Sequence, residues 1–584
     1  FPVTMHPCAF LLLMALALHH ALPADIRFQI SQLLNIECNF SIVVHSVLFV
    51  FIGMNDRGVV LRAFEQFRLK SCVDFKPRAA EEFYISVETD FLRFHTKLDV
   101  CWSYIGRSSP GGQTLSIGKD CGRKGIVEHQ FLHALGLNHE HSRYDRDDYS
   151  YFSKHSENVS TTQETPFDYY SVMHFDKNAF SNGNGSTIIT KSPEFQDVIG
   201  QLMEMSEHDA TELNKLYKCN SSVSFLDHCS FDEESLCEMS VCSAAGYGWQ
   251  REKSVSGINV TDHTYLGKEQ NGETRTSFFM HFSTEGRNEG DAARLESKTV
   301  TPTRDCKVQC LQFYYYHSGN ESDQLNIWIR ELQNEADSTG ALRLMDQITE
   351  TPGNYWKLHH VQLNANKSFQ VVFEARKGAG TSSGGFSLDD INISETECPF
   401  IWQIRDFEKK LDSGFDFGLS PMYCSSDGYR FAAELEVSSV NEFEIHAAFV
   451  TGAYDEQLQW PCPWRQITVQ ILDQNPHIQK RMSFEQSITT DPNLTRYGPV
   501  FISDELVFYN GPAFFKLLTR EDLARREFIK GGDLILLFTM QGGICEGTSE
   551  NKFNCCIKSK WSIISKIISI NVVHQSRHLS ASSE

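Results

Sequence analysis

The 584-residue sequence predicts a multidomain protein, in which an α+β unit precedes two antiparallel β-sandwich units. The length exceeds what one hydrophobic core supports and favours about three or four domains. Residues 57–69 carry apolar side chains at helical spacing, which predicts a helix in the first unit. Later runs are alternating or β-branched and predict strands: 310–316, 325–329, 369–373 and 467–472. The changes in sequence pattern along the chain place domain boundaries near 220–223 and at 398–399.

Charge and hydropathy exclude two classes of function. The chain has 53 basic and 75 acidic side chains and a formal net charge of -22. Such a chain repels a polyanion, so nucleic acid is not an expected partner. No run of the sequence approaches the roughly 20 apolar residues that span a bilayer, so no transmembrane segment is expected.

The first residues and the cysteine content predict export. Residues 5–24 contain the apolar run 9–18 and end on Leu22-Pro23-Ala24, a pattern typical of a secretory signal peptide, although a buried apolar helix is the alternative. Seventeen cysteines and nine Asn-X-Ser/Thr sequons favour an oxidising, glycosylating route. The sequons are at Asn39, Asn158, Asn184, Asn220, Asn259, Asn320, Asn366, Asn392 and Asn493. We therefore expect a secreted, extracellular glycoprotein with disulfide bonds.

Three further stretches complete the order of elements. Residues 25–54 form an atypical segment before the α+β unit, and their apolar run 40–53 is predicted to be a buried strand. A short strand is expected at 84–87. The tail, residues 542–584, is assigned to no domain.

The most informative motif contains three histidines. His129 and His133 are four residues apart, so on a helix their imidazoles share one face. Gly136 can end that helix with a positive φ, and His139 follows three positions later. Three neutral imidazoles leave one position open on a zinc ion, which is the layout of a catalytic site.

The alternative interpretation is that these are unrelated surface or core histidines. The residues near the motif argue against it. The glycine and third histidine match the spacing H-x-x-x-H-x-x-G-x-x-H, and Met173 follows in the segment SVMHF. The sequence therefore predicts one zinc ion per chain, bound by His129, His133 and His139.

These motifs resemble known families. The run 129–149 (HQFLHALGLNHEHSRYDRDDY) and the segment 171–174 are similar to astacin-type zinc endopeptidases. Residues 229–394, with SFDEESLCEM and GGFSLDDINIS, resemble a MAM domain, and the segment DEQLQWPCPWRQITVQILDQNP resembles a MATH (TRAF-like) domain. This order is similar to that of the meprins, most of all to the beta type of subunit. The resemblance implies a metzincin-type α+β peptidase domain over 55–219, a MAM jelly roll over 225–397 and a MATH domain over 398–541.

The resemblance also implies roles for single residues. Met173 would form the turn beneath the metal, and Glu140 would meet the mature amino terminus after propeptide removal. Two disulfides would be formed in the peptidase domain, by Cys72 with Cys219 and by Cys101 with Cys121. The MAM and MATH domains would assemble subunits into homo- or hetero-oligomers, and a membrane-anchored partner subunit would account for any association with the cell surface.

Four departures from the family pattern concern the chemistry. Gln130 stands where the family has the glutamate that transfers a proton, and an amide cannot do so. Phe175 replaces a tyrosine whose hydroxyl stabilises the oxyanion, and Leu202 replaces an arginine that favours acidic substrates. No maturation site is recognisable between residues 24 and 55, where Arg27 is the only basic residue.

Two functions of different classes follow. The first is a zinc metalloendopeptidase acting on peptides or proteins, of weak or no activity because Gln130 and Phe175 lack the reacting groups. The second is a non-catalytic secreted protein that binds peptides or assembles subunits through its MAM and MATH domains. Both functions predict bound zinc, and they differ in turnover.

Overall fold

The computed structural model describes residues 43–541 with internal gaps. The gaps are 50–53, 78–90, 96–99, 109–111, 119, 147–154, 157–160, 244–247, 256, 259, 271–272, 305–306, 335–336, 338, 414–416, 426–427, 440–441, 451–456, 459–464, 490–499, 503–504, 509–513 and 517–518. The expected signal peptide, the strand at 84–87 and the tail at 542–584 lie outside the described residues. No helix within the described ranges is long and apolar enough to cross a membrane.

The α+β unit contains one mixed sheet, of strand order β2-β1-β3-β5-β4. Its strands are β1 (Val43–Phe49), β2 (Val73–Pro77), β3 (Phe91–His95), β4 (Cys101–Ser103) and β5 (Gln113–Ile117). All neighbours are parallel except β4, which is antiparallel to β5. The strand expected in the apolar run 40–53 is β1, which lies between β2 and β3 and so belongs to this sheet.

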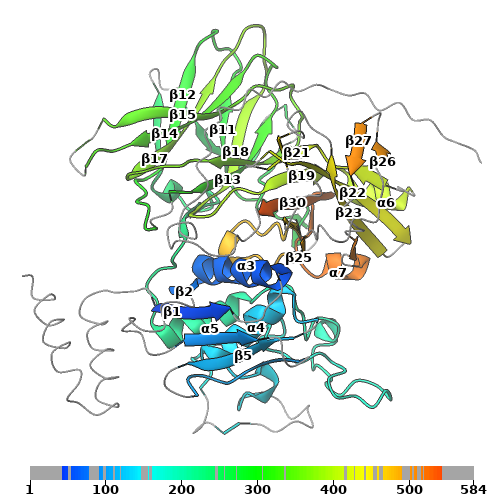
Figure 1. The fold of residues 1–584 in the computed structure, drawn as a ribbon. Helices are drawn as coiled ribbons and strands as arrows, with labels where there is room; N and C mark the ends of the chain where they lie inside the picture. Colours follow the sequence, from blue (N-terminus) through cyan, green and yellow to red (C-terminus); the bar gives the residue numbers. More distant parts are fainter. Residues whose placement is uncertain are drawn as a thin grey trace, which may run out of the picture. The chain divides into compact units, whose positions relative to one another are not determined.

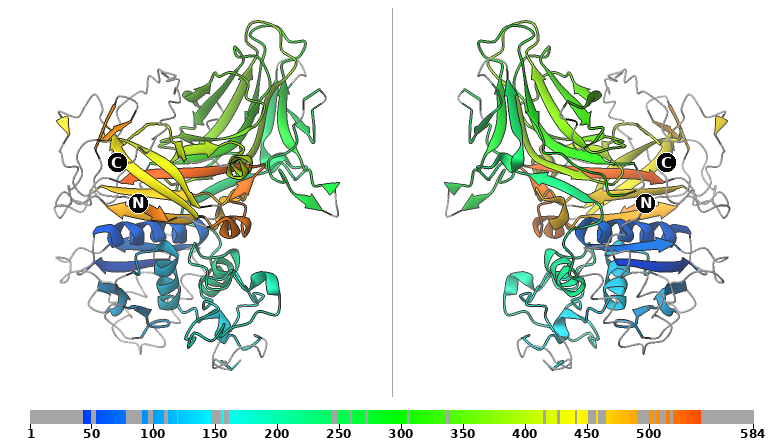
Figure 2. Two further views of the ribbon diagram at one scale, coloured as in Figure 1. Left: turned by 90° about the vertical axis from the view of Figure 1, so that its right-hand side faces the viewer. Right: turned by 90° about the vertical axis from the view of Figure 1, so that its left-hand side faces the viewer.

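Helices α3 (Met54–Lys70), α4 (Lys124–Ala134) and α5 (Glu207–Tyr217) complete this unit. Helix α3, predicted over 57–69, lies along one face of the sheet (Figures 1 and 2). Phe64, Phe67, Phe75 and Phe131 are fully buried and contact one another between α3, α4 and β2. This aromatic cluster is part of the core that fixes α4, the helix of the histidine motif.

Residues 225–394 form two antiparallel sheets around a shared core, as the β-sandwich expectation requires. One sheet has the order β16-β13-β18-β11-β8, with β6 beside β18. Its strands are β6 (Phe225–Cys229), β8 (Gln250–Glu252), β11 (Phe279–Ser283), β13 (Cys310–His317), β16 (Trp356–Gln362) and β18 (Gly385–Ser394). The other is ordered β15-β14-β17-β12-β7. It comprises β7 (Ser240–Ser243), β12 (Ala292–Glu296), β14 (Gln324–Glu331), β15 (Ala341–Ile348) and β17 (Phe369–Arg376).

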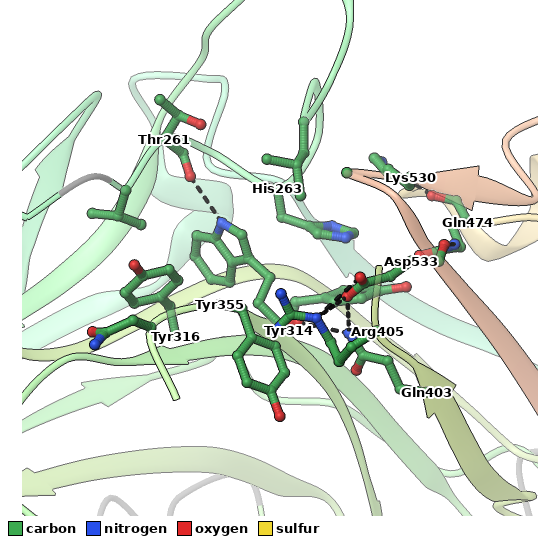
Figure 3. A pocket seen from close by; sticks show the side chains of 15 residues that line it. Thr261, His263, Tyr314, Tyr316, Tyr355, Gln403, Arg405, Gln474, Lys530 and Asp533 are labelled. Carbon is green, nitrogen blue, oxygen red and sulfur yellow. Dashed lines mark hydrogen bonds and ion pairs between the residues drawn. The ribbon is translucent and has the colours of Figure 1, made fainter. Parts of the chain in front are cut away.

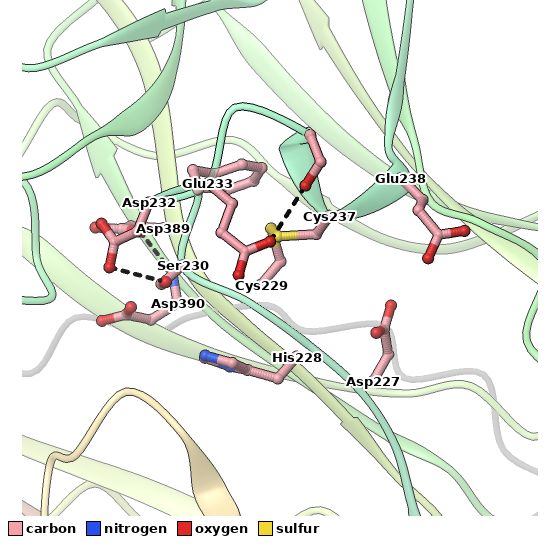
Figure 4. The surroundings of a disulfide bond; sticks show 12 residues. Asp227, His228, Cys229, Ser230, Asp232, Glu233, Cys237, Glu238, Asp389 and Asp390 are labelled. Carbon is pink, nitrogen blue, oxygen red and sulfur yellow. Dashed lines mark hydrogen bonds between the residues drawn. A yellow bond between two sulfur atoms is a disulfide. The ribbon is translucent and has the colours of Figure 1, made fainter.

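Disulfides connect distant parts of the chain. Cys72 pairs with Cys219 and Cys101 with Cys121, the two pairings that the family resemblance implied. In the sandwich, Cys229 pairs with Cys237, near the carboxylates of Asp232, Asp389 and Asp390 (Figure 4). Cys310 pairs with Cys398 at the end of the sandwich. Two of the described cysteines, Cys242 and Cys424, are exposed and outside any disulfide.

The last expected domain contains two further sheets. The first has the order β19-β30-β24-β25, with β29 beside β30. Its strands are β19 (Phe400–Ile404), β24 (Gln466–Ile471), β25 (Phe484–Thr489), β29 (Ile529–Lys530) and β30 (Asp533–Gln541). The second has the order β20-β22-β23-β27-β26, with β21 beside β22 and β28 beside β23. It contains β20 (Phe417–Leu419), β21 (Tyr423–Cys424), β22 (Arg430–Ser439), β23 (Glu442–Val450), β26 (Val500–Ile502), β27 (Glu505–Phe508) and β28 (Phe514–Lys516).

The chain divides into two compact units that do not follow the expected domain boundaries. The first consists of the described residues within 1–409, 468–487 and 522–538, and the second of those within 410–467, 488–521 and 539–584. Most of β24, β25 and β30 therefore belongs to the first unit, together with the histidine motif. The sheet that contains β22 and β23 belongs to the second.

Candidate metal centre

Helix α4 and the turn after it bring the three histidines together. His129 and His133 lie one turn apart on α4, which ends at Ala134. The N–H of Gly136 donates to the carbonyl of His133 at 2.9 Å. Gly136 has a φ of +110°, a backbone angle that residues other than glycine rarely adopt. The chain turns there, and His139 precedes the short 3-10 helix η2 (Glu140–Ser142).

The ring nitrogens converge on a single point. One ligand atom from each of His129, His133 and His139 lies within 4.8 Å of the other two. The Nε2 atoms of His133 and His139 are 3.1 Å apart, a spacing at which two imidazoles can share one metal ion or one proton. Three nitrogens so placed match three of the four positions that zinc takes in proteins.

Backbone carbonyls orient two of the rings. His129 Nδ1 lies 2.8 Å from the carbonyl oxygen of Val172, and His133 Nδ1 lies 2.9 Å from that of Leu137. A protonated Nδ1 donates to each carbonyl, so the lone pair is on Nε2, the atom that faces the other rings. Burial, followed by the charge of His129, lowers the pKa of His133 to about 4. The rings are therefore neutral at pH 7, as metal ligands must be.

Gln130 follows the first histidine and is almost fully buried, with 6% of its surface exposed. Its amide oxygen Oε1 has no hydrogen-bond partner among the described residues. A buried carbonyl oxygen without a partner is costly, by about 1–3 kcal/mol. The donor set and this unpaired acceptor together fit a site that holds a metal ion and polar ligands.

The Met-containing turn is hydrogen-bonded to the histidine motif and depends on a residue that the sequence pattern did not reveal. Met173 is 1% exposed, and its carbonyl accepts the N–H of Glu140 at 3.0 Å. The buried Asp209 accepts hydrogen bonds from Ser171 Oγ at 2.6 Å and from the N–H of Val172 at 2.9 Å. Val172 in turn supplies the carbonyl that orients His129, so Asp209 positions a ligand indirectly.

A sequence signal for Asp209 existed but pointed only to a helix end. Ser206 caps α5, and Ser206 and Asp209 form a reciprocal capping box. The sequence Ser-Glu-His-Asp predicts that box, whereas the contact with the turn at 171–173 arises only when α5 packs there.

Phe175 lies against His139 and His141. Its ring centroid is 4.4 Å from that of His139 and 4.0 Å from that of His141. The side chain at this position therefore reaches the edge of the histidine cluster, but it has no hydroxyl to donate.

Glu140 is buried and lies next to Arg143. Its Oε1 accepts the N–H of Asp168 at 2.8 Å and lies 3.4 Å from Arg143 Nη1. Burial raises the pKa of Glu140 well above its usual value, and Arg143 opposes that rise. The residues that would supply an amino terminus here lie outside the described ranges.

Leu202 occupies the expected specificity position and is 40% exposed. Its backbone lies close to the start of α4, where a Cβ on Gly125 would be 2.3 Å from the Leu202 carbonyl oxygen. An apolar side chain is thus held near the helix that carries the histidines.

One expected glycosylation site, Asn392, is buried in the structure. Asn392 in β18 is 0% exposed, and its Nδ2 donates to the carbonyls of Asp390 and Pro476. Its Oδ1 accepts the N–H of Ile478 at 3.2 Å, so the amide is enclosed and fully hydrogen-bonded. A sequon carries no information about burial, and the folded chain leaves no space for a glycan on this amide. Asn184, Asn220 and Asn366 are exposed, Asn320 is half-buried, and Asn39, Asn158, Asn259 and Asn493 lie outside the described residues.

A small cavity of about 160 Å³ lies in the first unit, lined only by residues from Val260 onward, so it is separate from the histidines. Tyr314, Tyr316 and Tyr355 form part of its wall (Figure 3). Its charged groups are paired, since Arg405 and Asp533 are 2.8 Å apart. The histidine cluster is therefore the better candidate for chemistry.

Family models match three parts of the chain. The model of the astacin peptidase family matches residues 43–218, which begins before the expected boundary at residue 55. The model of the MAM domain (meprin/A5/mu) matches 229–399, and that of the TRAF/meprin MATH domain matches 418–537.

Whole-chain relatives agree with these matches. Meprin A subunit beta of Homo sapiens is 44% identical over 85% of this chain and 73% of its own length. Meprin A subunit alpha of Rattus norvegicus is 38% identical over 75% of this chain and 60% of its own length. Among solved structures, high choriolytic enzyme 1 of Oryzias latipes, a hatching enzyme zinc protease, is 33% identical, covers 31% of this chain and 92% of its own, and has a TM-score of 0.28. The chain therefore belongs to the meprins, within the astacin family of zinc metalloendopeptidases.

Proposed function

We propose that this meprin-type chain holds one zinc ion through His129, His133 and His139 and hydrolyses peptide bonds weakly or not at all. The observation that carries the proposal is the buried amide of Gln130, which directly follows a ligand histidine and has no hydrogen-bond partner for its Oε1 among the described residues. A zinc ion, when bound, supplies a Lewis acid for water and for the substrate carbonyl.

The chain's own residues decide how much turnover follows. An amide donates and accepts hydrogen bonds, so Gln130 can orient a water molecule, but it cannot take up its proton. Phe175 cannot donate to an oxyanion. Proton transfer and oxyanion stabilisation are both weakened, while the groups that hold the metal are intact.

A variant series tests this proposal. The full chain, with its zinc content measured, is assayed against a mixed peptide library as the wild type, Gln130→Glu, Phe175→Tyr and the double variant. Restoring the acid-base group should raise turnover by roughly 10²–10⁴-fold. Gln163→Glu makes the same chemical change in a loop without a ligand histidine and should have no effect.

Two results would contradict the proposal. One is wild-type turnover that a chelator abolishes and that Gln130→Glu does not increase. The other is a purified protein that contains no stoichiometric zinc when the metal is supplied in excess.

The second candidate is peptide capture without cleavage, which an intact ligand set without a proton acceptor favours. A peptide would then bind to the zinc-loaded chain and be recovered uncut, whereas chelation would weaken its binding. Detectable cleavage of the bound peptide by the wild type would exclude this function.

Location and assembly are part of the proposal. Four disulfides among the described cysteines and the exposed sequons at Asn184 and Asn366 support an extracellular site of action. The MAM and MATH domains support assembly into homo- or hetero-oligomers, and a membrane-anchored partner subunit would hold the complex at a cell surface. Light scattering of the purified protein, with and without reductant, tests assembly, and a monomer at all concentrations would contradict it.

A further inference from the structure

A second group of metal-binding side chains occurs in the other compact unit, on strands β22 and β23. These strands are antiparallel, and Glu436 is paired with Glu444 and Glu434 with His446. Because side chains two residues apart on a strand share a face, these four side chains lie on the same face of the sheet.

Three of these side chains converge. His446 Nε2 lies 3.3 Å from a carboxylate oxygen of Glu436. One ligand atom each from Glu436, Glu444 and His446 lies within 4.8 Å of the other two. The side chain of His446 is 17% exposed and that of Glu436 is 53% exposed, so an ion from solvent can reach the group.

The backbone register makes this arrangement costly without a counter-charge. Two carboxylates directly opposite each other on an antiparallel ladder repel and destabilise the pair. Lys516 of β28 is the backbone partner of Glu444 on its other side. The imidazole of His446 offers a nitrogen, Nε2, 3.3 Å from a carboxylate oxygen of Glu436, where an ion could bind both.

We propose that Glu436, Glu444 and His446 form a zinc site separate from the histidine cluster. One imidazole and two carboxylates are a donor set that zinc accepts, whereas calcium prefers oxygen ligands alone. Three protein ligands leave one position open on an exposed surface. The ion bridges β22 and β23 and therefore stabilises the second compact unit.

Zinc titration of the full chain tests this site. The zinc-depleted protein is titrated by calorimetry, and two classes of zinc site are expected in the wild type. Glu436→Gln and His446→Gln should each weaken one class by more than about 10-fold and leave the other unchanged. His133→Gln should do the reverse, so failure at the first site is distinguishable from failure at this one.

A matched control is available in the sandwich. His359 Nε2 lies 2.8 Å from a carboxylate oxygen of Asp346. Among the described residues, no third metal-binding side chain converges with this pair. His359→Gln should leave both zinc classes unchanged. Calcium should not replace zinc in the class that His446→Gln weakens, because one of the three ligand atoms there is an imidazole nitrogen.

Two results would overturn the proposal. The first is a wild type that shows only the class lost in His133→Gln. The second is a second class that survives both Glu436→Gln and His446→Gln, which would make the contact between Glu436 and His446 a simple ion pair. Because Glu436 is half-exposed, its amide variant retains the fold, so a loss of zinc there reports the site itself.

Discussion

The ring of Phe175 packs against the imidazole of His139, with centroids 4.4 Å apart and an interplanar angle of 62°. The side chain at this position therefore reaches the histidine cluster, but it has no hydroxyl. In the Gln130→Glu background, Phe175→Tyr should raise kcat by roughly 10²-fold with little change in KM, because an oxyanion donor acts mainly in the transition state. If Phe175→Tyr raised kcat by the same factor in the wild-type background, the hydroxyl would act without the carboxylate of the Gln130→Glu variant, which would contradict this prediction.

Zinc removal should lower thermal stability. An ion that binds only the folded state stabilises it by about 4 kcal/mol at a thousand times its Kd. Chelation should therefore reduce the Tm of the wild type, and zinc should restore it. The variant His133→Ala, with the same treatment, should show a smaller change, which differential scanning calorimetry would detect.

Glu485 should make stability depend on pH. Burial raises its pKa, but Arg62 at 2.7 Å and Lys124 at 3.1 Å outweigh burial and lower the pKa to about 2. The charged carboxylate is favoured in the folded state, so its contribution is complete above the usual pKa of 4.5 and is lost as the pH falls through 2. Glu485→Gln should lower the free energy of unfolding by roughly 3–5 kcal/mol at pH 7.

The control for Glu485 is an exposed ion pair. Asp412 and Arg520 are 2.9 Å apart, and their side chains are 64% and 43% exposed. Asp412→Asn should cost less than about 1 kcal/mol at any pH. Denaturant titrations from pH 7 to pH 2 should show wild type and Glu485→Gln converging below pH 4.5, and curves that stay parallel would contradict the assignment.

The two disulfides with the most different loops should differ in effect. Cys72–Cys219 closes a separation of 147 residues, whereas Cys229–Cys237 closes one of 8. A longer loop loses more chain entropy on closure, so replacing Cys72 and Cys219 by serine should cost about 2–5 kcal/mol and the shorter pair less. Equal losses of denaturation midpoint would show that strain or packing dominates instead.

Glycopeptide mapping should separate exposed from buried sequons. Asn184 and Asn366 are exposed and should carry glycans, whereas Asn392 is enclosed and should not. Mass spectrometry of the protein purified from a glycosylating host cell checks all three. A glycan on Asn392 would require β18 to be open when the glycosylating enzyme acts.

Local pattern determined which three histidines come together and the helix that holds two of them. The spacing of His129, His133 and His139, with Gly136 between, depends only on the pitch of a helix and on a turn with positive φ. The helix predicted over 57–69 is α3, for the same reason. The disulfide pairings came from family resemblance, because four cysteines alone leave several connectivities open.

The tertiary structure decided every feature that joins residues far apart in the chain. Arg62 meets Glu485 across 423 positions, Asp209 reaches the turn at Val172 from another helix, and burial encloses Asn392. The register that sets Glu436 opposite Glu444 belongs to the pairing of two strands. Hydrophobic periodicity reports which side of an element faces the core, but the partner across that core is chosen by the packing of the whole fold.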